Sequence, residues 1–148
     1  MRLYVGSDHG GVELRRALVQ HATAAGHEVL AEIGPGSPSD SVDYPDVSAE
    51  ICQRVLKDSG AFGLLVCGTG QGMAMAANRH KGIRAAVVAD PFSAKMARAH
   101  NDANVLCLGG RVVAAGLAAE LFDAFARASF EGGRHERRVA KIEALSDN

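Results

Sequence analysis

The sequence predicts one α/β domain with a three-layer, Rossmann-like fold, in which helices cover both faces of a five-stranded parallel sheet. Strand-like and helix-like segments alternate along the whole chain, the order that builds parallel strands with helical crossovers. The central strand segment, 62–66, is continuously apolar, as expected for a strand that is covered on both faces. The length of 148 residues suits a single domain, 1–148.

The first half of the chain supplies three expected strands and two helices. A short apolar run before turn residues predicts the first strand, and apolar residues at helical spacing predict the first helix. The expected strands are Arg2–Gly6, His27–Ile33 and Phe62–Val66. The expected helices run from Val12 to Gly26 and from about Asp46 to Lys57, and a loop-like stretch, 34–40, precedes the second one.

The second half continues this alternation. Its expected strands are Arg84–Ala89 and Asn104–Leu108, and its expected helices are Met73–Asn78, Pro91–His100, Ala114–Ser129 and a charged helix from about Arg134. Apolar side chains on one stripe of helix 114–129 indicate either core or a subunit contact. Because ligands of open parallel sheets bind beyond the carboxyl ends of the strands, we expect the site in the loops that follow the strands.

Composition and charge exclude several classes of protein. The chain carries 16 Lys and Arg against 17 Asp and Glu, so it lacks the basic excess typical of nucleic-acid-binding proteins. It shows no apolar run long enough to span a membrane and no signal peptide at its start. Its three cysteines lie far apart, outside any metal-binding pattern, which favours reduced thiols. We therefore expect a cytoplasmic protein without a metal, a nucleic-acid partner or a membrane partner.

Glycine is over-represented, and the positions of the glycines indicate a candidate site. The chain has 17 of them, about 11% against a usual 7%. Gly68, Gly70 and Gly72 occupy alternate positions between the central strand and the next helix. Such a loop lets the amides at a helix start face an anion. The dinucleotide fingerprint and the Walker lysine are missing, so a tight turn without a ligand is an equally good interpretation of the glycines alone.

Cys67 favours a functional loop over a simple turn. It stands where the strand becomes the helix, and helix-terminal amides favour the thiolate form of a cysteine. A thiolate there suits a nucleophile or a general base, and the hydroxyl of Thr69 could hold or pass a proton. The other cysteines, Cys52 in a helix and Cys107 in a strand, have the pattern of small buried apolar side chains.

Two histidines lie next to polar residues at element ends. Asp8 and His9 follow the first strand, where Asp8 has an alternative role as the cap of the next helix. That role leaves His9 unexplained. His100 and Asn101 end another helix, where interaction of a histidine with the helix dipole is an equally good interpretation.

A basic group follows near the end of the chain. Arg134 and Arg138 are four residues apart, so they share one face of a helix, and His135 lies between them in the sequence. Paired guanidinium groups suit a phosphate, because each presents planar forked donors and stays charged. A solvated basic surface is the alternative, although Gly132 and Gly133 are an unusual start for such a helix.

These residues combine into short motifs that follow one another along the chain. The motifs are Asp8-His9-Gly10-Gly11, Asp43-Tyr44-Pro45, Cys67-Gly68-Thr69-Gly70-Gln71-Gly72, His100-Asn101-Asp102-Ala103-Asn104-Val105, Gly110-Arg111 and Gly132-Gly133-Arg134-His135 with Arg138-Val139. Together they resemble the type B ribose-5-phosphate isomerases, over residues 8 to 139. The wider family includes galactose-6-phosphate isomerase subunits.

The resemblance implies interconversion of ribose 5-phosphate and ribulose 5-phosphate, an aldose–ketose isomerisation of the pentose phosphate pathway that needs no metal or cofactor. It implies that Cys67 is the base that moves a proton between C2 and C1 through an enediolate, with help from Thr69. Some relatives use a glutamate on the following helix, but segment 73–78 has no acidic residue. The resemblance assigns ring opening to His100 and places Asp8 near the ring oxygen or hydroxyls.

The resemblance also implies how substrate is bound and how many chains take part. It matches the amides of residues 68–72 to an anion hole for the enediolate, whereas the loop by itself would suggest phosphate there. It places the site between two subunits of a homodimer, or of a tetramer, where His100 and the C-terminal arginines of one chain complete the site around Cys67 of the other. The residues that it matches to substrate binding are His9, Tyr44, Gly68, Gly70, Gly72, Asn101, Arg111, Arg134, His135 and Arg138.

Other functions stay open from the sequence. The same chemistry could act on galactose 6-phosphate, allose 6-phosphate or a tetrose phosphate, with loop 34–42 setting the choice. A non-catalytic nucleotide-binding module of the stress-protein type would use the glycine loop for ATP, but it would not need Cys67, His100 and the arginine pair together. A thiol redox sensor built on Cys67 lacks an evident resolving cysteine.

Overall fold

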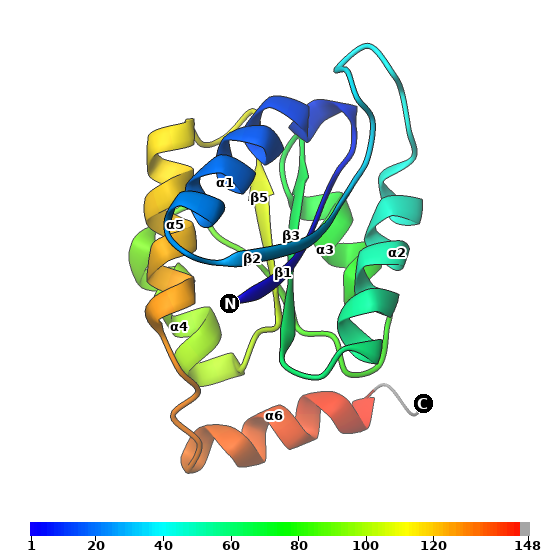
Figure 1. The fold of residues 1–148 in the computed structure, drawn as a ribbon. Helices are drawn as coiled ribbons and strands as arrows, with labels where there is room; N and C mark the ends of the chain where they lie inside the picture. Colours follow the sequence, from blue (N-terminus) through cyan, green and yellow to red (C-terminus); the bar gives the residue numbers. More distant parts are fainter. Residues whose placement is uncertain (146–148) are drawn as a thin grey trace.

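The computed structural model describes residues 1–145 and has the predicted Rossmann-like α/β architecture (Figure 1). Five parallel strands form one sheet in the order β2-β1-β3-β5-β4. The strands are β1 (Arg2–Ser7), β2 (Glu28–Ile33), β3 (Ala61–Cys67), β4 (Ala85–Val87) and β5 (Val105–Gly109). The helices are α1 (Val12–Ala24), α2 (Tyr44–Lys57), α3 (Gln71–Ala77), α4 (Pro91–Asn101), α5 (Ala115–Arg127) and α6 (Arg134–Ala144), with a 3₁₀ turn, η1, at His9–Gly11.

Helices cover both faces of the sheet and so form three layers (Figure 1). Helices α1, α4 and α5 pack on one face, and α2 and α3 pack on the other. The apolar stripe of α5, with Leu121, Phe122 and Phe125, is fully buried inside this chain's own core. The stripe is therefore core, and the alternative that it forms a subunit contact is wrong. No helix within residues 1–145 combines the length and apolarity that crossing a membrane requires.

The ends of the elements differ from the sequence expectations by one or two residues. Helix α2 begins at Tyr44 rather than at about Asp46, because Pro45 has a backbone suited to the first turn of a helix. Strand β4 covers only Ala85–Val87 and lies at the edge of the sheet, where it pairs with β5 alone.

Different loops and helix ends lie at the two ends of the sheet, and they determine where the candidate site residues lie. At the carboxyl end of the strands lie η1, the loop between β3 and α3, and the turn after β5. At the amino end lie the last turns of α4 and α5 and the whole of α6, which runs below the sheet in Figure 1. Strands of five to seven residues separate the two ends by about 15–20 Å.

Candidate active site

Glycine-containing loops interlock at the carboxyl end of the central strands. A Cβ atom on Gly11 would lie 2.4 Å from the carbonyl oxygen of Val66, and one on Gly110 would lie 2.7 Å from that of Gly10. The amide of Gly110 donates to the carbonyl oxygen of Cys67 at 2.8 Å. Glycine is required here because backbone packs directly on backbone. This packing holds the segment 67–72, which we call the Cys67 loop, in one position.

The thiol of Cys67 lies at the centre of this arrangement. Cys67 ends β3, and its Sγ accepts a hydrogen bond from the amide of Gly70 at 3.1 Å. Gly70 has a φ of 80°, in the left-handed region that glycine adopts without strain, and this turn aims its amide at the sulfur. The cysteine is buried with 5% exposure. A backbone N–H aimed at sulfur suits a thiolate, the form that a base or nucleophile needs.

The other two cysteines have a different environment. Cys52 and Cys107 are completely buried among apolar side chains of the core. Burial raises the pKa of the Cys52 thiol to about 11 and also raises the pKa of Cys107. Both are therefore neutral thiols at physiological pH, as predicted for small apolar side chains, and all three cysteines are free.

Asp8 and His9 lie beside the Cys67 loop. Asp8 is buried, and its Oδ1 accepts from the amide of Gly10 at 2.8 Å. It therefore caps the 3₁₀ turn η1. The expected cap of the helix from Val12 is wrong, because the N-cap of α1 is Gly11. His9 is half-buried, and its Nδ1 finds no hydrogen-bond partner within residues 1–145. A buried ring nitrogen without a partner is costly, so it marks a position where an added polar group would be stabilised.

The side chain of Thr69, within the Cys67 loop, and that of Tyr44, beside it, are both exposed. The ring of Tyr44 crosses the first turn of α3 so closely that a Cβ atom on Gly72 would lie 2.7 Å from it. The hydroxyl of Thr69 accepts from the amide of Gln71 at 3.4 Å. A phenol and a hydroxyl therefore stand at the rim, where they can reach a bound molecule.

The guanidinium of Arg111 completes this end of the site. Arg111 follows β5, and a Cβ atom on Gly68 would lie 3.4 Å from its Nη1. The structure thus gathers nine predicted residues at the carboxyl end: Asp8, His9, Tyr44, Cys67, Gly68, Thr69, Gly70, Gly72 and Arg111. They combine a thiol with backbone amides and one fixed positive charge.

The remaining predicted residues lie at the amino end: His100, Asn101, Arg134, His135 and Arg138. The rings of His100 and His135 stack, with centroids 4.1 Å apart and planes at 10°. Glu131 lies beside both, with its Oε2 3.5 Å from Nε2 of His100 and 3.9 Å from Nε2 of His135. Burial lowers the pKa of His135, and the nearby His100 and Arg134 lower it further. A neutral, stacked ring therefore anchors the start of α6.

His100, Glu131 and His135 also form the one group of three or more residues within 1–145 whose metal-ligating atoms lie within 4.8 Å of one another. A metal binds in the plane of an imidazole ring, and here the two planes are almost parallel, so their lone pairs do not converge on one ion. Arg134 also donates to Nε2 of His135 at 3.4 Å. This geometry suits polar contacts with an organic ligand better than metal coordination.

The structure therefore divides the predicted site residues into two sets at opposite ends of the sheet. Helix α4 runs antiparallel to the strands, so His100 ends up far from Cys67 in the same chain. Glu131, in the irregular segment between α5 and α6, is a member of the amino-end set that the sequence motifs do not include. Glu131 precedes the helix, so helical spacing does not apply to it, and no pattern in the sequence indicates its position beside His100 and His135.

Known proteins match the chain along nearly its whole length. The family described as Ribose/Galactose Isomerase matches residues 3–142. Ribose-5-phosphate isomerase B of Escherichia coli is 42% identical over 144 residues, 97% of this chain and 95% of that protein. Ribose-5-phosphate isomerase B of Clostridium thermocellum superposes with a TM-score of 0.95 at 42% identity, over 99% of this chain and 98% of that one.

A further solved structure contains a bound sugar phosphate. Ribose-5-phosphate isomerase B of Mycoplasma genitalium, with bound ribulose-5-phosphate, has a TM-score of 0.93 and 38% identity, over 99% of this chain and 97% of that one. Family and structural matches thus cover both the Cys67 loop and helix α6. The chain therefore belongs to the ribose/galactose isomerase family.

Proposed function

We propose that this protein is an aldose–ketose isomerase that interconverts ribose 5-phosphate and ribulose 5-phosphate. The observation that carries the proposal is the thiol of Cys67, held at 3.1 Å from the amide of Gly70 at the carboxyl end of the sheet. Its support includes the relatives named ribose-5-phosphate isomerase B and the Mycoplasma genitalium relative with bound ribulose 5-phosphate. Family membership favours this activity over the nucleotide-binding and redox alternatives.

The reaction moves protons without a change in the overall oxidation state of the sugar. Ring opening breaks the bond between C1 and the ring oxygen, which gains a proton while the C1 hydroxyl loses one. His100 suits this step, because a histidine both donates and accepts protons near neutral pH. The thiolate of Cys67 then removes the proton from C2 to form an enediolate and returns it to C1. The hydroxyl of Thr69 assists the matching transfer between the two oxygens.

The two sets of residues suit two different negative charges of the substrate. The enediolate carries charge that develops only during the reaction, so amides already aimed by the Cys67 loop stabilise it without reorganisation. The phosphate keeps its charge throughout, so its binding by Arg134 and Arg138 anchors the substrate without lowering the barrier of the chemical step. This division supports an anion hole in the Cys67 loop and phosphate at the arginines.

We infer that the working unit contains two copies of the chain, because one chain holds its two sets of site residues at opposite ends of the sheet. A second copy that presents His100 and the arginines of α6 to the Cys67 loop would complete the site. No cofactor is needed for this proton transfer. Three free cysteines without a disulfide support work in a reducing compartment such as the cytoplasm.

A second candidate substrate class is another aldose phosphate, since the matching family covers both ribose and galactose isomerases. The segment between β2 and α2 leads directly to Tyr44 at the rim of the site. Its start is held by Arg15, whose Nη2 donates to the carbonyl oxygen of Pro35 at 2.9 Å. This segment is therefore placed to set the length of sugar that the site accepts.

Steady-state kinetics with four-, five- and six-carbon aldose phosphates test the proposal. We expect the highest kcat/KM for ribose 5-phosphate, and a fall of about 10²–10⁴-fold in kcat for Cys67→Ala, the range of a lost general base. Cys52→Ala is the matched control and should keep its activity, because that thiol is a core side chain. Substantial turnover by Cys67→Ala would refute the role of the thiol, and tight ATP binding without turnover would refute the isomerase.

A further inference from the structure

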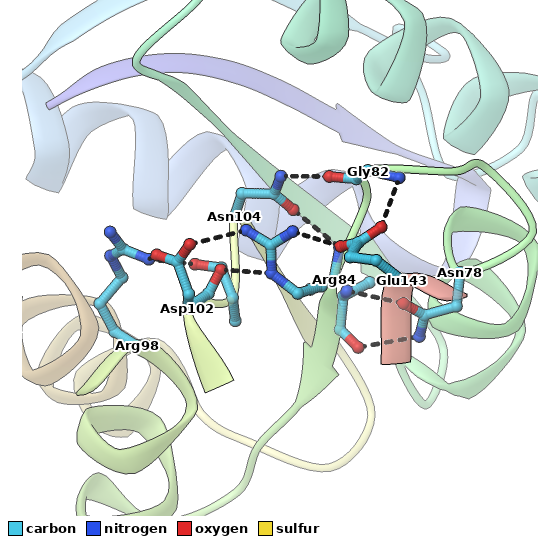
Figure 2. A network of polar contacts seen from close by, with 9 residues as sticks. Asn78, Gly82, Arg84, Arg98, Asp102, Asn104 and Glu143 are labelled. Atoms are coloured by element: carbon cyan, nitrogen blue, oxygen red, sulfur yellow. Dashed lines mark hydrogen bonds and ion pairs between the residues drawn. The ribbon is translucent and has the colours of Figure 1, made fainter. Parts of the chain in front are cut away.

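A network of polar contacts joins three elements at the amino end, and Arg84 lies at its centre (Figure 2). Arg84 stands just before β4, and its side chain is largely buried, with 17% exposure. Its Nη1 donates to Glu143 of α6 at 2.6 Å. Its Nη2 donates to Oδ2 of Asp102 at 2.9 Å, and its Nε donates to the carbonyl oxygen of the same residue at 2.9 Å. One guanidinium thus binds two carboxylates from different elements.

Both carboxylates are held by further contacts. The second oxygen of Glu143 accepts from the amide of Gly82 at 3.1 Å. Asp102 also accepts from Arg98 on the last turns of α4. Asp102 has a φ of 49°, in the left-handed region that costs energy for a residue other than glycine, so these contacts help hold the turn that ends α4. The network therefore fixes the partners of Arg84 as well as Arg84 itself.

The two partners of Arg84 belong to the segments that carry the amino-end site residues. Asp102 directly follows the two site residues that end α4, and Glu143 lies in the last turn of the helix that carries the arginine pair. Helix α6 is otherwise mostly exposed, with His135 as its one buried residue among those described. It is attached at its start by the stack on His100 and towards its end by the ion pair with Arg84.

We propose that Arg84 is a positioning residue that fixes α6 relative to the end of α4, so that the phosphate-binding arginines and His100 keep one geometry. The inference rests on the proposed function, which assigns the phosphate to α6. Arginine suits this place because its planar fork reaches two carboxylates in a fixed orientation, whereas lysine offers a single point charge. Arg84 does not itself contact the substrate in this assignment.

The deciding variant is Glu143→Ala, which removes the link to α6 but leaves Arg84 paired with Asp102. We expect its Kd for inorganic phosphate, by isothermal titration calorimetry, and its KM for ribose 5-phosphate to rise together about tenfold, the effect of losing one ordering contact. We expect kcat to change by less than about twofold, the pattern of lost uniform binding. Glu143→Gln retains an acceptor for Arg84 and should restore most of the affinity. Arg84→Lys should show the same direction of change.

Asp58→Ala is the matched control. Asp58 forms a two-point ion pair with Arg2, at 2.7 and 2.9 Å, and its side chain is 23% exposed against 28% for Glu143. We expect it to lower the Tm by a similar amount and to leave the phosphate Kd unchanged.

Three results would overturn the role of Arg84: an unchanged phosphate Kd in Glu143→Ala, an equal rise in Asp58→Ala, or a wild-type protein that does not bind phosphate. Wild-type protein that binds phosphate but turns over no aldose phosphate would instead refute the proposed isomerase, while the phosphate titrations still test Arg84.

Discussion

The two ends of the sheet hold their functional groups by different means. At the carboxyl end, backbone packs on backbone, and a glycine amide aims at the thiol of Cys67. At the amino end, side chains hold side chains, through the stacked imidazoles and the ion pairs of Arg84. Rigid amides suit charge that appears only in the transition state, whereas paired side chains are sufficient for a phosphate that is charged throughout. The construction of each end thus matches the charge that we propose it binds.

The largest expected effect is the recovery of activity when two inactive variants are combined. It tests whether the carboxyl end of one chain and the amino end of another form one shared site. We expect Cys67→Ala and the double variant Arg134→Ala, Arg138→Ala each to be nearly inactive alone at ribose 5-phosphate concentrations near the wild-type KM, the first through kcat and the second through a raised KM. If the working unit is the proposed dimer, unfolding the two variants together and refolding them makes half of the dimers hybrids with one intact site, so activity should return to about a quarter of the wild-type value. Turnover of ribose 5-phosphate before and after mixing measures this recovery.

Mixing two batches of the same variant is the control for that experiment and should restore nothing. If mixed refolding of the two different variants also restores nothing, while each variant keeps its fold by circular dichroism, the two ends do not form a shared site.

The next effect probes the backbone packing of the carboxyl end. We expect Gly11→Ala to lower the free energy of unfolding by about 2–3 kcal/mol, or roughly 5–10 °C in Tm, because its Cβ would lie 2.4 Å from a carbonyl oxygen. Gly36→Ala is the matched control, since a Cβ there meets nothing within 4 Å. Thermal unfolding, monitored by circular dichroism, compares the two variants. Equal Tm values would mean that the interlocked loops move to accommodate the added Cβ atom at little cost in stability.

Most of the arrangement at the carboxyl end could be predicted from the sequence, but little of the arrangement at the amino end could be. Apolar periodicity and turn residues predict the strands, and the thiol and glycines follow one strand directly, so their proximity is local in the chain. His100 and Arg134 also stand out as residues, but their position depends on the direction of α4 and on where α6 packs. The role of Arg84 is not visible in the sequence at all, because its partners lie 18 and 59 positions away.

A smaller effect concerns the phosphate contacts that we propose for α6. We expect Arg138→Gln to raise KM for ribose 5-phosphate by roughly 10–100-fold with little change in kcat, because hydrogen bonds to a charged group contribute about 1.5–3 kcal/mol. Arg137 lies on a different face of the same helix, so Arg137→Gln is the control. A matching rise in KM for both variants would indicate a diffuse basic surface rather than a phosphate site.

The smallest expected effect is a dependence of local stability on pH, which should appear at the amino end of the sheet and not at the carboxyl end. Burial, followed by the charges of His100 and Arg134, lowers the pKa of His135, and Arg138 acts in the same direction while Glu131 opposes it. The His135 side chain therefore binds a proton more readily in the unfolded chain than in the folded one. The stability that the neutral His135 ring contributes is complete above about pH 6.5, and it is lost as the pH falls towards the pKa of His135 in the folded protein.

Hydrogen exchange at pH 7.5 and pH 5.5 measures this difference within one molecule. We expect the amides of α6 to lose protection at the lower pH, because a charged His135 ring is disfavoured beside His100 and the arginines. The amides of the Cys67 loop should keep theirs, because backbone contacts hold that loop. His135→Gln should remove the pH dependence of α6. Equal losses at both ends would show that the stacked histidines do not control the attachment of α6.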